Sequence, residues 1–294
     1  MTGAEARPPA ASLALYDRTA RDAAATVIAN YSTSFALACR LLGVRTRPHV
    51  RSVYALVRVA DEVVDGPAAA AGLPIPEAAA VLDGLERETL ASIDRGFSAN
   101  LIVHAFALTA RECGIGADLV GPFFTAMRTD LSIRAHDGDS HDEYVYGSAE
   151  VVGLMCLRVF LNAGEADPVD PPPALADGAR RLGAAFQDVN FLRDLDHDGS
   201  VLGRDYLGLE SGSVSRDDVL ARIDRDLAAA AEVIPSLPAD CRRAVTAAHD
   251  LFAELSVRLR ADPGTAGRVR VPDTVKARLA ARAWLGFAPR EVRA

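Results

Sequence analysis

Two acidic side chains four residues apart mark the first segment that could do chemistry. Residues 53–66 read VYALVRVADEVVDG, in which Arg58 precedes Asp61 by three residues and Asp65 follows it by four. On a helix these three side chains share one face. Two carboxylates so placed repel each other unless a cation lies between them, and Mg²⁺, which prefers oxygen ligands, suits the pair. A solvated acidic helix face is the alternative, but the apolar residues around the pair predict a buried helix.

A second polar stripe lies in residues 184–198, which read AAFQDVNFLRDLDHD. Asn190, Asp194 and Asp198 follow Gln187 at steps of three, four and four residues, so the four side chains share one stripe of a helix. Apolar residues separate them, which is typical of a cavity wall. A helix end with its acids facing water is the alternative, although acids there oppose the helix dipole.

The two acidic rows could face each other across one cavity of a helical bundle. Mg²⁺ between them would bind diphosphates and neutralise the charge that develops on a leaving diphosphate. An apolar cavity would hold a hydrocarbon chain and keep water from a carbocation. The pattern therefore predicts the ionisation of an allylic diphosphate.

The rest of the chain predicts the helices that must position these rows. Alanine and leucine are abundant, aromatic residues make up only 6%, and period-two alternation is rare. The expected helices are 13–30, 34–42, 48–65, 76–95, 99–113, 116–134, 141–161, 174–196, 215–233, 239–259 and 273–286. Short loops with Pro and Gly separate them. We expect an all-α, single-domain helical bundle with a central apolar cavity over residues 12–294, behind a mobile tail of residues 1–11.

Composition excludes several classes of protein. The 294 residues carry a net charge of −8 and are 50% hydrophobic, which indicates a globular chain and argues against nucleic acid as a partner. The four cysteines have neither metal nor disulfide spacing, as a reducing cytoplasm would allow. We find no signal peptide, and no apolar run approaches the roughly 20 residues that span a bilayer. We expect a cytoplasmic protein, with peripheral contact at the inner membrane face as an option.

Four ordered blocks then resemble the squalene/phytoene synthase family, the head-to-head prenyltransferases, over about residues 31–285. The blocks are Ser32 to Phe35, Tyr54 to Asp65, Tyr144 to Leu154, and Gln187 to Asp198, followed by a G-R-x-Y-L sequence at 203–207. Within the family the chain looks most like bacterial phytoene synthases. It departs from the family pattern at Glu62, where aspartate is commoner, at Arg51, where tryptophan is frequent, and at Thr33, where lysine is frequent.

The resemblance implies a role for each matching residue. The metal ligands would be Asp61, Asp65, Asn190, Asp194 and Asp198. The diphosphate contacts would be Ser34, Tyr54, Arg58, Arg193 and Arg204, with Arg268 or Arg270 as a further cation. The catalytic residues would be Tyr144, Gln187, Asp61 and Asp194. The cavity would be lined by Phe35, Cys39, Ala149, Val152 and Gly153.

The implied reaction joins two prenyl diphosphates through a cyclopropylcarbinyl diphosphate, with Mg²⁺ as the cofactor and Mn²⁺ as an alternative. We expect two geranylgeranyl diphosphates to give phytoene for carotenoid biosynthesis without NADPH, since a small residue at Cys39 favours C20 over C15 chains. Either Tyr144 or the released diphosphate would take the proton. The alternatives are a C30 enzyme that makes presqualene diphosphate, dehydrosqualene or squalene from farnesyl diphosphate, a terpene cyclase, and an inactive partner subunit. The oligomeric state stays open.

Overall fold

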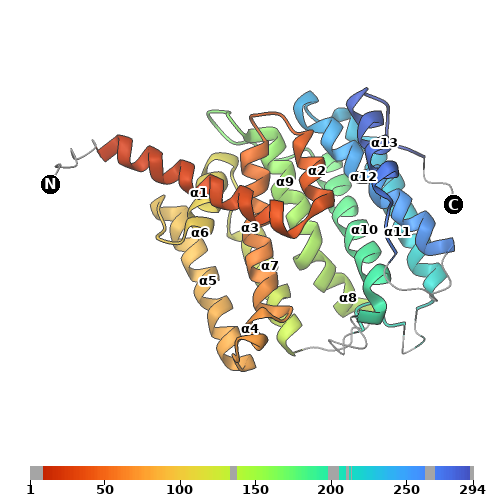
Figure 1. Ribbon diagram of the computed structural model, residues 1–294, viewed down its shortest axis with the longest axis horizontal. Helices are drawn as coiled ribbons and strands as arrows, with labels where there is room; N and C mark the ends of the chain where they lie inside the picture. The colour runs from red at the N-terminus through yellow and green to blue at the C-terminus, as the bar shows by residue number, and fades with distance from the viewer. Residues whose placement is uncertain are drawn as a thin grey trace.

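Helices form the described part of the chain, and no strand occurs in residues 9–132, 138–197, 205–209, 212, 214–261 and 269–291 of this computed structural model (Figure 1). The helices are α1 (Pro9–Tyr31), α2 (Thr33–Arg40), α3 (Arg47–Val64), α4 (Pro67–Ala70), α5 (Ile75–Arg95), α6 (Leu101–Cys113), α7 (Ala117–Ser132), α8 (Gly138–Val145), α9 (Val151–Asn162), α10 (Pro173–His197), α11 (Arg216–Val233), α12 (Ala239–Ala261) and α13 (Asp273–Trp284). A π-helix, η1 (Tyr146–Glu150), and a 3-10 turn, η3 (Ile234–Ser236), complete them.

The ends of the helices follow from their sequence. The Asn100 side chain accepts hydrogen bonds from the first backbone N–H groups of α6, and Ser215 caps α11 in a reciprocal arrangement with Asp218. Gly96 and Gly114 end α5 and α6 in the left-handed conformation that glycine adopts without strain. The expected tail of residues 1–11 overlaps α1, which already begins at Pro9; the residues before it lie outside the described part.

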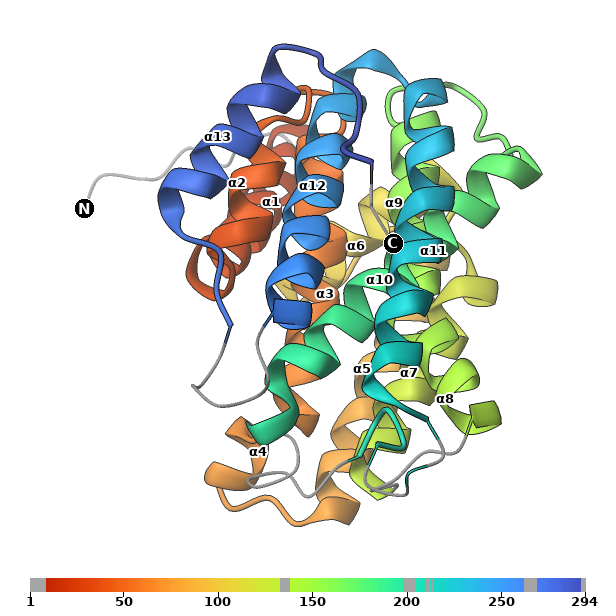
Figure 2. The same cartoon turned by 90° about the vertical axis from the view of Figure 1, so that its right-hand side faces the viewer.

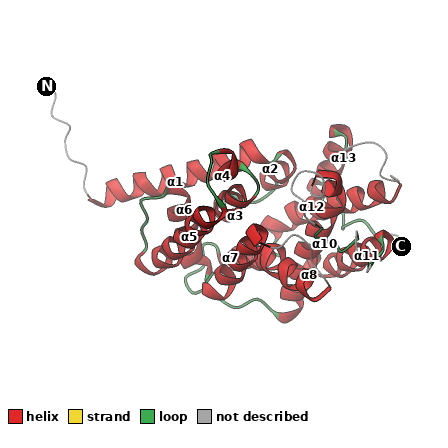
Figure 3. Cartoon of the chain, turned by 90° about the horizontal axis from the view of Figure 1, so that it is seen from below, coloured by secondary structure: helices red, strands yellow, loops and turns green. Residues whose placement is uncertain are grey.

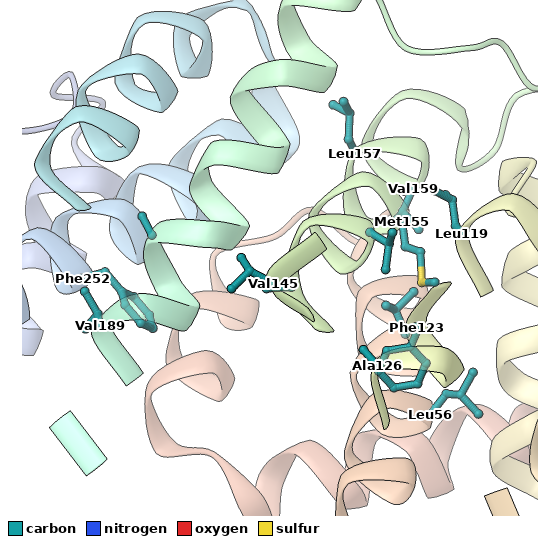
Figure 4. Packing of buried hydrophobic residues seen from close by; sticks show 14 of the residues in the cluster. Leu56, Leu119, Phe123, Ala126, Val145, Met155, Leu157, Val159, Val189 and Phe252 are labelled. Atoms are coloured by element: carbon teal, nitrogen blue, oxygen red, sulfur yellow. The ribbon is translucent and has the colours of Figure 1, made fainter. Parts of the chain in front are cut away.

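The helix α10 holds the bundle together, because it packs against α9, α11 and α12. Figure 2 shows α10 beside α11 and α12, and in the end-on view of Figure 3 α1 extends from one side of the bundle and α13 lies toward the other. Large apolar side chains from several of these helices fill the interior (Figure 4). Among them Leu56 of α3, Phe123 of α7 and Met155 of α9 are at most 2% exposed.

The segment that carries Tyr144 changes pitch halfway along. α8, η1 and α9 follow one another without a break, and the Val151 N–H binds the Tyr146 carbonyl, five residues back. Such π-turns are commonly found at functional sites. The glycines beside it allow close packing, since a Cβ on Gly147 would lie 2.5 Å from the Pro122 carbonyl oxygen of α7, and one on Gly183 of α10 would lie 2.6 Å from the Ala149 carbonyl oxygen.

The continuous helix from Ser140 to Asn162 is long and apolar enough to cross a membrane, by length and composition alone. Its most apolar window has a mean hydropathy of 1.4, and 44% of that window is buried in the protein. The expectation that no segment reaches this length counted only uninterrupted apolar residues and therefore missed it. The π-helix and α9 pack against α7 and α10, as a core helix of a bundle does.

Candidate functional site

The first acidic pair lies at the carboxyl end of α3. Asp61 belongs to its last turn, and Asp65 caps the helix through a backbone hydrogen bond of 2.8 Å to the Asp61 carbonyl. Burial, together with the charges of Asp65 and Asp130, raises the pKa of Asp61 to about 8, although the Arg58 guanidinium lowers it. Burial, which is the largest of these causes, and the neighbouring carboxylates together outweigh the effect of Arg58 on the pKa of Asp61.

Asp130 of α7 is the acid that the sequence analysis missed. Its carboxylate is 7% exposed and accepts hydrogen bonds of 2.8 Å from both the Tyr144 and the Tyr206 hydroxyl groups. Its charge also acts on Asp61, so α7 contributes to the same acidic group as α3. A single aspartate at the end of an apolar helix has no motif, and only the position of α7 against the π-helix reveals it.

The rings of Tyr144, Tyr206 and Phe191 pack against one another next to Asp130. The rings of Phe191 and Tyr206 are stacked with centroids 4.4 Å apart, and Tyr144 lies 5.2 Å from Tyr206 and 6.1 Å from Phe191. Burial and the charge of Asp130 hold the pKa of Tyr144 well above its ordinary value. Tyr144 is therefore a protonated phenol that donates to Asp130.

The second polar stripe is only partly described. Gln187, Asn190 and Asp194 lie half-buried on α10, and both carboxylate oxygens of Asp194 contact the neighbouring Arg193, at 3.0 and 2.6 Å. The carboxyl ends of α3 and α10 lie at the same end of the bundle in both views (Figures 1 and 2). Asp198, Arg204 and Arg268, all named as site residues, lie outside the described residues, whereas Arg270 is exposed just before α13.

The expected diphosphate contacts Tyr54 and Arg58 lie on α3, the helix that carries the acidic pair, and the charge of Asp61 acts on both. Arg58 forms an ion pair with Glu62, lies 4.6 Å from the ring centre of Tyr31, and keeps a buried Nε without a hydrogen-bond partner. The half-buried Tyr54 is hydrogen-bonded to Ser32, and burial raises its pKa. Ser34 lies on α2, but its side chain is outside the described part.

Aromatic side chains form an apolar wall next to these polar groups. The Phe35 ring lies 6.2 Å from Tyr54, 6.2 Å from Phe186 and 5.9 Å from Phe252, and the last two are stacked at 3.8 Å. The wall joins α2, α3, α10 and α12. Sequence reasoning found Phe35 but neither Phe186 nor Phe252, since single phenylalanines on apolar helices carry no signal.

The residues expected to line the cavity separate into two places. Cys39 lines a cavity of about 440 Å³ between α1, α2, α3 and α13, and burial raises the pKa of its thiol to about 11. The other lining residues are Ala25, Ile28, Ala29, Ser32, Ala36, Leu37, Arg40, Arg51, Asp273, Lys276 and Ala277. Gly153 lies instead at the contact between α9 and α10, where a Cβ would be 2.4 Å from the Ala179 carbonyl oxygen. Ala149 and the half-buried Val152 flank that contact.

The donor set of the site suits a hard cation. No group of three or more His, Cys, Asp or Glu side chains that could hold a metal occurs among the described residues. Asp61 and Asp65 nevertheless supply carboxylate oxygens, and after burial the charge of Asp65 is the largest cause of the raised pKa of Asp61. Mg²⁺ fits such a pair, because it commonly takes one or two carboxylates and fills its remaining positions with water and phosphate oxygens.

Comparison with known proteins gives the class and then the family. The chain has the all-α fold of isoprenoid synthases: it aligns with the crystal structure of a dehydrosqualene synthase at a TM-score of 0.76 and 22% identity, covering 91% of this chain and 96% of that one. It aligns with squalene synthase HpnC from Alicyclobacillus acidocaldarius at 0.69 and 20% identity, covering 84% and 95%.

Residues 28–212 match the model of the squalene/phytoene synthase family. A 15-cis-phytoene synthase from Paracoccus sp. (strain N81106 / MBIC 01143) is 30% identical over 269 residues, 84% of either chain. A phytoene synthase from Pseudescherichia vulneris is 29% identical over 268 residues, 83% of this chain and 84% of that one. The chain belongs to the squalene/phytoene synthase family, which is a family of prenyltransferases.

Proposed function

We propose that this protein condenses two geranylgeranyl diphosphates head to head into phytoene, in carotenoid biosynthesis, within one domain over residues 12–294. The observation that supports the chemistry is the hydrogen-bonded Asp130–Tyr144 pair next to Asp61, at the edge of an apolar interior. The similarity to two bacterial phytoene synthases over more than four fifths of the chain supports the C20 substrate.

Mg²⁺, or Mn²⁺ in its place, would be held by Asp61 and Asp65 on α3 and by Asn190, Asp194 and Asp198 at the end of α10. When bound, it supplies positive charge to the departing diphosphate. The proposal for Asp61 and Asp65 is supported by their positions one turn apart at the end of α3 and by the action of the Asp65 charge on Asp61. It predicts that the reaction stops when divalent cations are removed.

The protein's own cations orient the diphosphates. The buried Nε–H of Arg58 has no hydrogen-bond partner, so it is a donor available to a diphosphate oxygen. Tyr54, Ser34, Arg193 and Arg204 are the other proposed contacts. Arg193 is paired with Asp194 in the structure, so this guanidinium would be shared between the carboxylate and a bound diphosphate.

Tyr144 and Asp130 provide a route for the proton that the reaction releases. As the carbon–hydrogen bond breaks, the Tyr144 oxygen takes the proton and passes its own hydroxyl proton to Asp130, 2.8 Å away. The tyrosine is then neutral before and after the step, which its raised pKa favours. The released diphosphate is the alternative acceptor, and Gln187 would lie near the cation.

The apolar residues keep water from the carbocation. Phe35, Phe186 and Phe252 provide the aromatic wall, and Cys39, Ala149, Val152 and Gly153 are the proposed remainder of the cavity. Cys39 is small, as the proposal of a longer substrate chain requires, but the 440 Å³ cavity that it lines is also bordered by Arg40, Arg51, Asp273 and Lys276, so the support for a C20 chain comes from the similar phytoene synthases.

We also propose a cytoplasmic enzyme that contacts the inner face of a membrane, because its hydrocarbon product has no polar group. An apolar tip at the carboxyl end of α13 supports this contact: Trp284, Leu285 and Phe287 are 60%, 65% and 55% exposed. Arg282 stiffens the tip, since it lies 5.3 Å from the Phe287 ring centre and donates to the Ala288 carbonyl at 2.7 Å. Tryptophan and arginine together suit an anionic lipid surface.

The test is to incubate the purified protein with Mg²⁺ and either geranylgeranyl or farnesyl diphosphate, with and without NADPH, and to extract the hydrocarbons. A C40 triene from geranylgeranyl diphosphate without NADPH is the expected result. A C30 product from farnesyl diphosphate would favour the C30 alternative. The dehydrosqualene synthase, which has the same fold, is an enzyme of that kind. A terpene from one substrate molecule, or no product, would contradict both.

A further inference from the structure

A buried carboxylate on α10 connects three helices behind the proposed site. Asp188 is 1% exposed, and its Oδ2 accepts a hydrogen bond of 2.7 Å from Arg222 Nε on α11. Its Oδ1 lies 3.2 Å from His141 Nε2 on α8, and Arg222 Nη2 lies 3.2 Å from the same nitrogen. The three side chains thus form a closed triangle, called the 141–188–222 triangle below.

The 141–188–222 triangle fixes the relative orientation of its helices more than it stabilises the folded protein. A buried carboxylate costs free energy unless it is paired and hydrogen-bonded, and apolar residues of similar size often pack two helices as well or better. Arg222 holds Oδ2 of Asp188 in a fixed direction, and its planar guanidinium accepts few other arrangements. With a proton on Nε2, His141 donates to Oδ1 of Asp188, and Arg222 Nη2 then only lies beside that nitrogen. The triangle therefore holds α8, α10 and α11 in one relative position.

Two residues of the 141–188–222 triangle, His141 and Asp188, lie close in sequence to proposed catalytic residues. His141 is three residues, about one helical turn, before Tyr144, and Asp188 directly follows Gln187. The His141 ring also lies edge-on against Phe191, 6.5 Å between centroids, and Phe191 packs on Tyr144. A shift in the triangle would therefore move the Tyr144 hydroxyl relative to Gln187.

We propose that Asp188 is a positioning residue: through His141 and Arg222 it fixes α8 on α10 and so sets where the Tyr144 hydroxyl lies. Asp188 does not belong to the polar stripe, because it is one residue, about 100° of helix, away from Gln187. It acts on the reaction only through the position of Tyr144. The inference rests on the proposed function for its kinetic readout.

The first test is the Asp188→Asn variant, which keeps the size of the side chain but loses its charge. We expect kcat to fall at least about tenfold, because small misplacements of a reacting group have effects of that size, while KM changes less than twofold. We also expect a larger share of the cyclopropylcarbinyl diphosphate relative to the final hydrocarbon. Arg222→Gln, in a side chain that is 29% exposed and so tolerant of change, should do the same, and the double variant should be no worse than either single one.

The matched control is Asp226→Asn. Asp226 also joins α10 to α11, through Arg181 at 3.0 Å, but it does not contact His141. We expect its kcat and product ratio to stay within twofold of the original protein. An equal loss in this control, or an unchanged product ratio in folded Asp188→Asn and Arg222→Gln proteins, would overturn the proposal.

A second readout does not need activity. With 3-fluorotyrosine at the six tyrosines, the Tyr144 signal is assigned from a Tyr144→Phe sample and followed by ¹⁹F NMR. Asp188→Asn and Arg222→Gln should move or broaden this signal, whereas Asp226→Asn should not; an unmoved signal would contradict the proposal. If the original protein makes no hydrocarbon from either substrate yet the signal moves, the proposed function is wrong and the positioning role stands.

Discussion

The Asp130 carboxylate accepts a 2.8 Å hydrogen bond from the hydroxyl of Tyr144, a residue on a different helix. The other oxygen of the same carboxylate accepts a bond of equal length from Tyr206, which lies 76 residues further along the chain. One buried acid thus connects two tyrosines, and its charge reaches the Asp61 carboxyl as well. The proposed proton route and the proposed metal site are therefore coupled through the charge of Asp130.

Asp130→Asn should slow the reaction strongly while the protein stays folded. The amide oxygen can still accept a hydrogen bond from one tyrosine, and the amide N–H can donate to the hydroxyl oxygen of the other, but the amide cannot take the proton that Tyr144 passes on. We expect kcat to fall by about 10²- to 10⁴-fold, the range for lost general-base catalysis. Steady-state kinetics measures this fall in kcat. The control is the Tyr206→Phe variant, in which the lost hydrogen bond should cost only about 1 kcal/mol of stability. Normal turnover in Asp130→Asn would assign the proton to the released diphosphate.

The affinity for Mg²⁺ should rise with pH up to about pH 8. Because the pKa of Asp61 is about 8 without metal, a proton competes with the cation below that pH. We expect the Mg²⁺ concentration for half-maximal activity to decrease as the pH rises from 6.5 to 8.5. We also expect Mg²⁺ binding to release protons. Isothermal titration calorimetry in buffers of different ionisation enthalpy measures that release; a heat independent of the buffer would contradict the prediction.

The metal-free protein should lose stability as the pH rises, through the same group. The pKa of Asp61 is raised from 3.8 to about 8 by folding, so its stabilising contribution is present below pH 3.8 and is lost as the pH rises to 8. Asp61→Asn mimics the protonated acid. At pH 8.5 this variant should melt at least about 2–4 °C higher than the original protein, which corresponds to about 1 kcal/mol. A thermal melt at pH 5 is the control, where the gain should be smaller.

Asp61→Asn and Asp194→Asn should each abolish turnover, although the first stabilises the metal-free protein. The reason is that an amide is a weaker ligand for Mg²⁺ than a carboxylate. Product extraction after long incubation with Mg²⁺ measures the loss. Unchanged activity in one of these variants would remove the proposed metal role of the residue that is replaced in it.

Membrane contact should depend on the apolar tip at the carboxyl end of α13. Replacing Trp284 and Phe287 together with Ser should abolish sedimentation with phosphatidylglycerol vesicles, since both side chains are more than half exposed. Activity in detergent micelles should stay unchanged, because the tip is not part of the proposed site. Vesicle binding that survives this double change would place the contact elsewhere.

Much of the fold could be predicted, because helix periodicity and Pro/Gly positions are local signals. The expected helices 48–65, 174–196 and 215–233 correspond within one residue at each end to α3, α10 and α11. The short α4 was not expected, since four residues are too few for a period. The expected helix 141–161 corresponds to α8, η1 and α9, whose change of pitch no sequence pattern indicated.

The site was predictable only where its residues repeat at helical spacing. The Asp61–Asp65 pair and the α10 stripe carry such a spacing, whereas Asp130 and Phe252 reach their partners through tertiary packing alone. Gly153 shows the reverse case. It matched a family block, and its place in the structure is explained by the close contact with the Ala179 carbonyl.

The π-helix at residues 146–150 makes the position of Tyr144 depend on the number of residues in this segment more than on their identity. Removing one residue there would restore an ordinary helix and rotate α8 by about 100° relative to α9. Tyr144 would then face away from Asp130 even though every catalytic side chain is still encoded. Over these residues a one-codon deletion should be more damaging than almost any substitution, and sequences that diverge widely here should still agree in length.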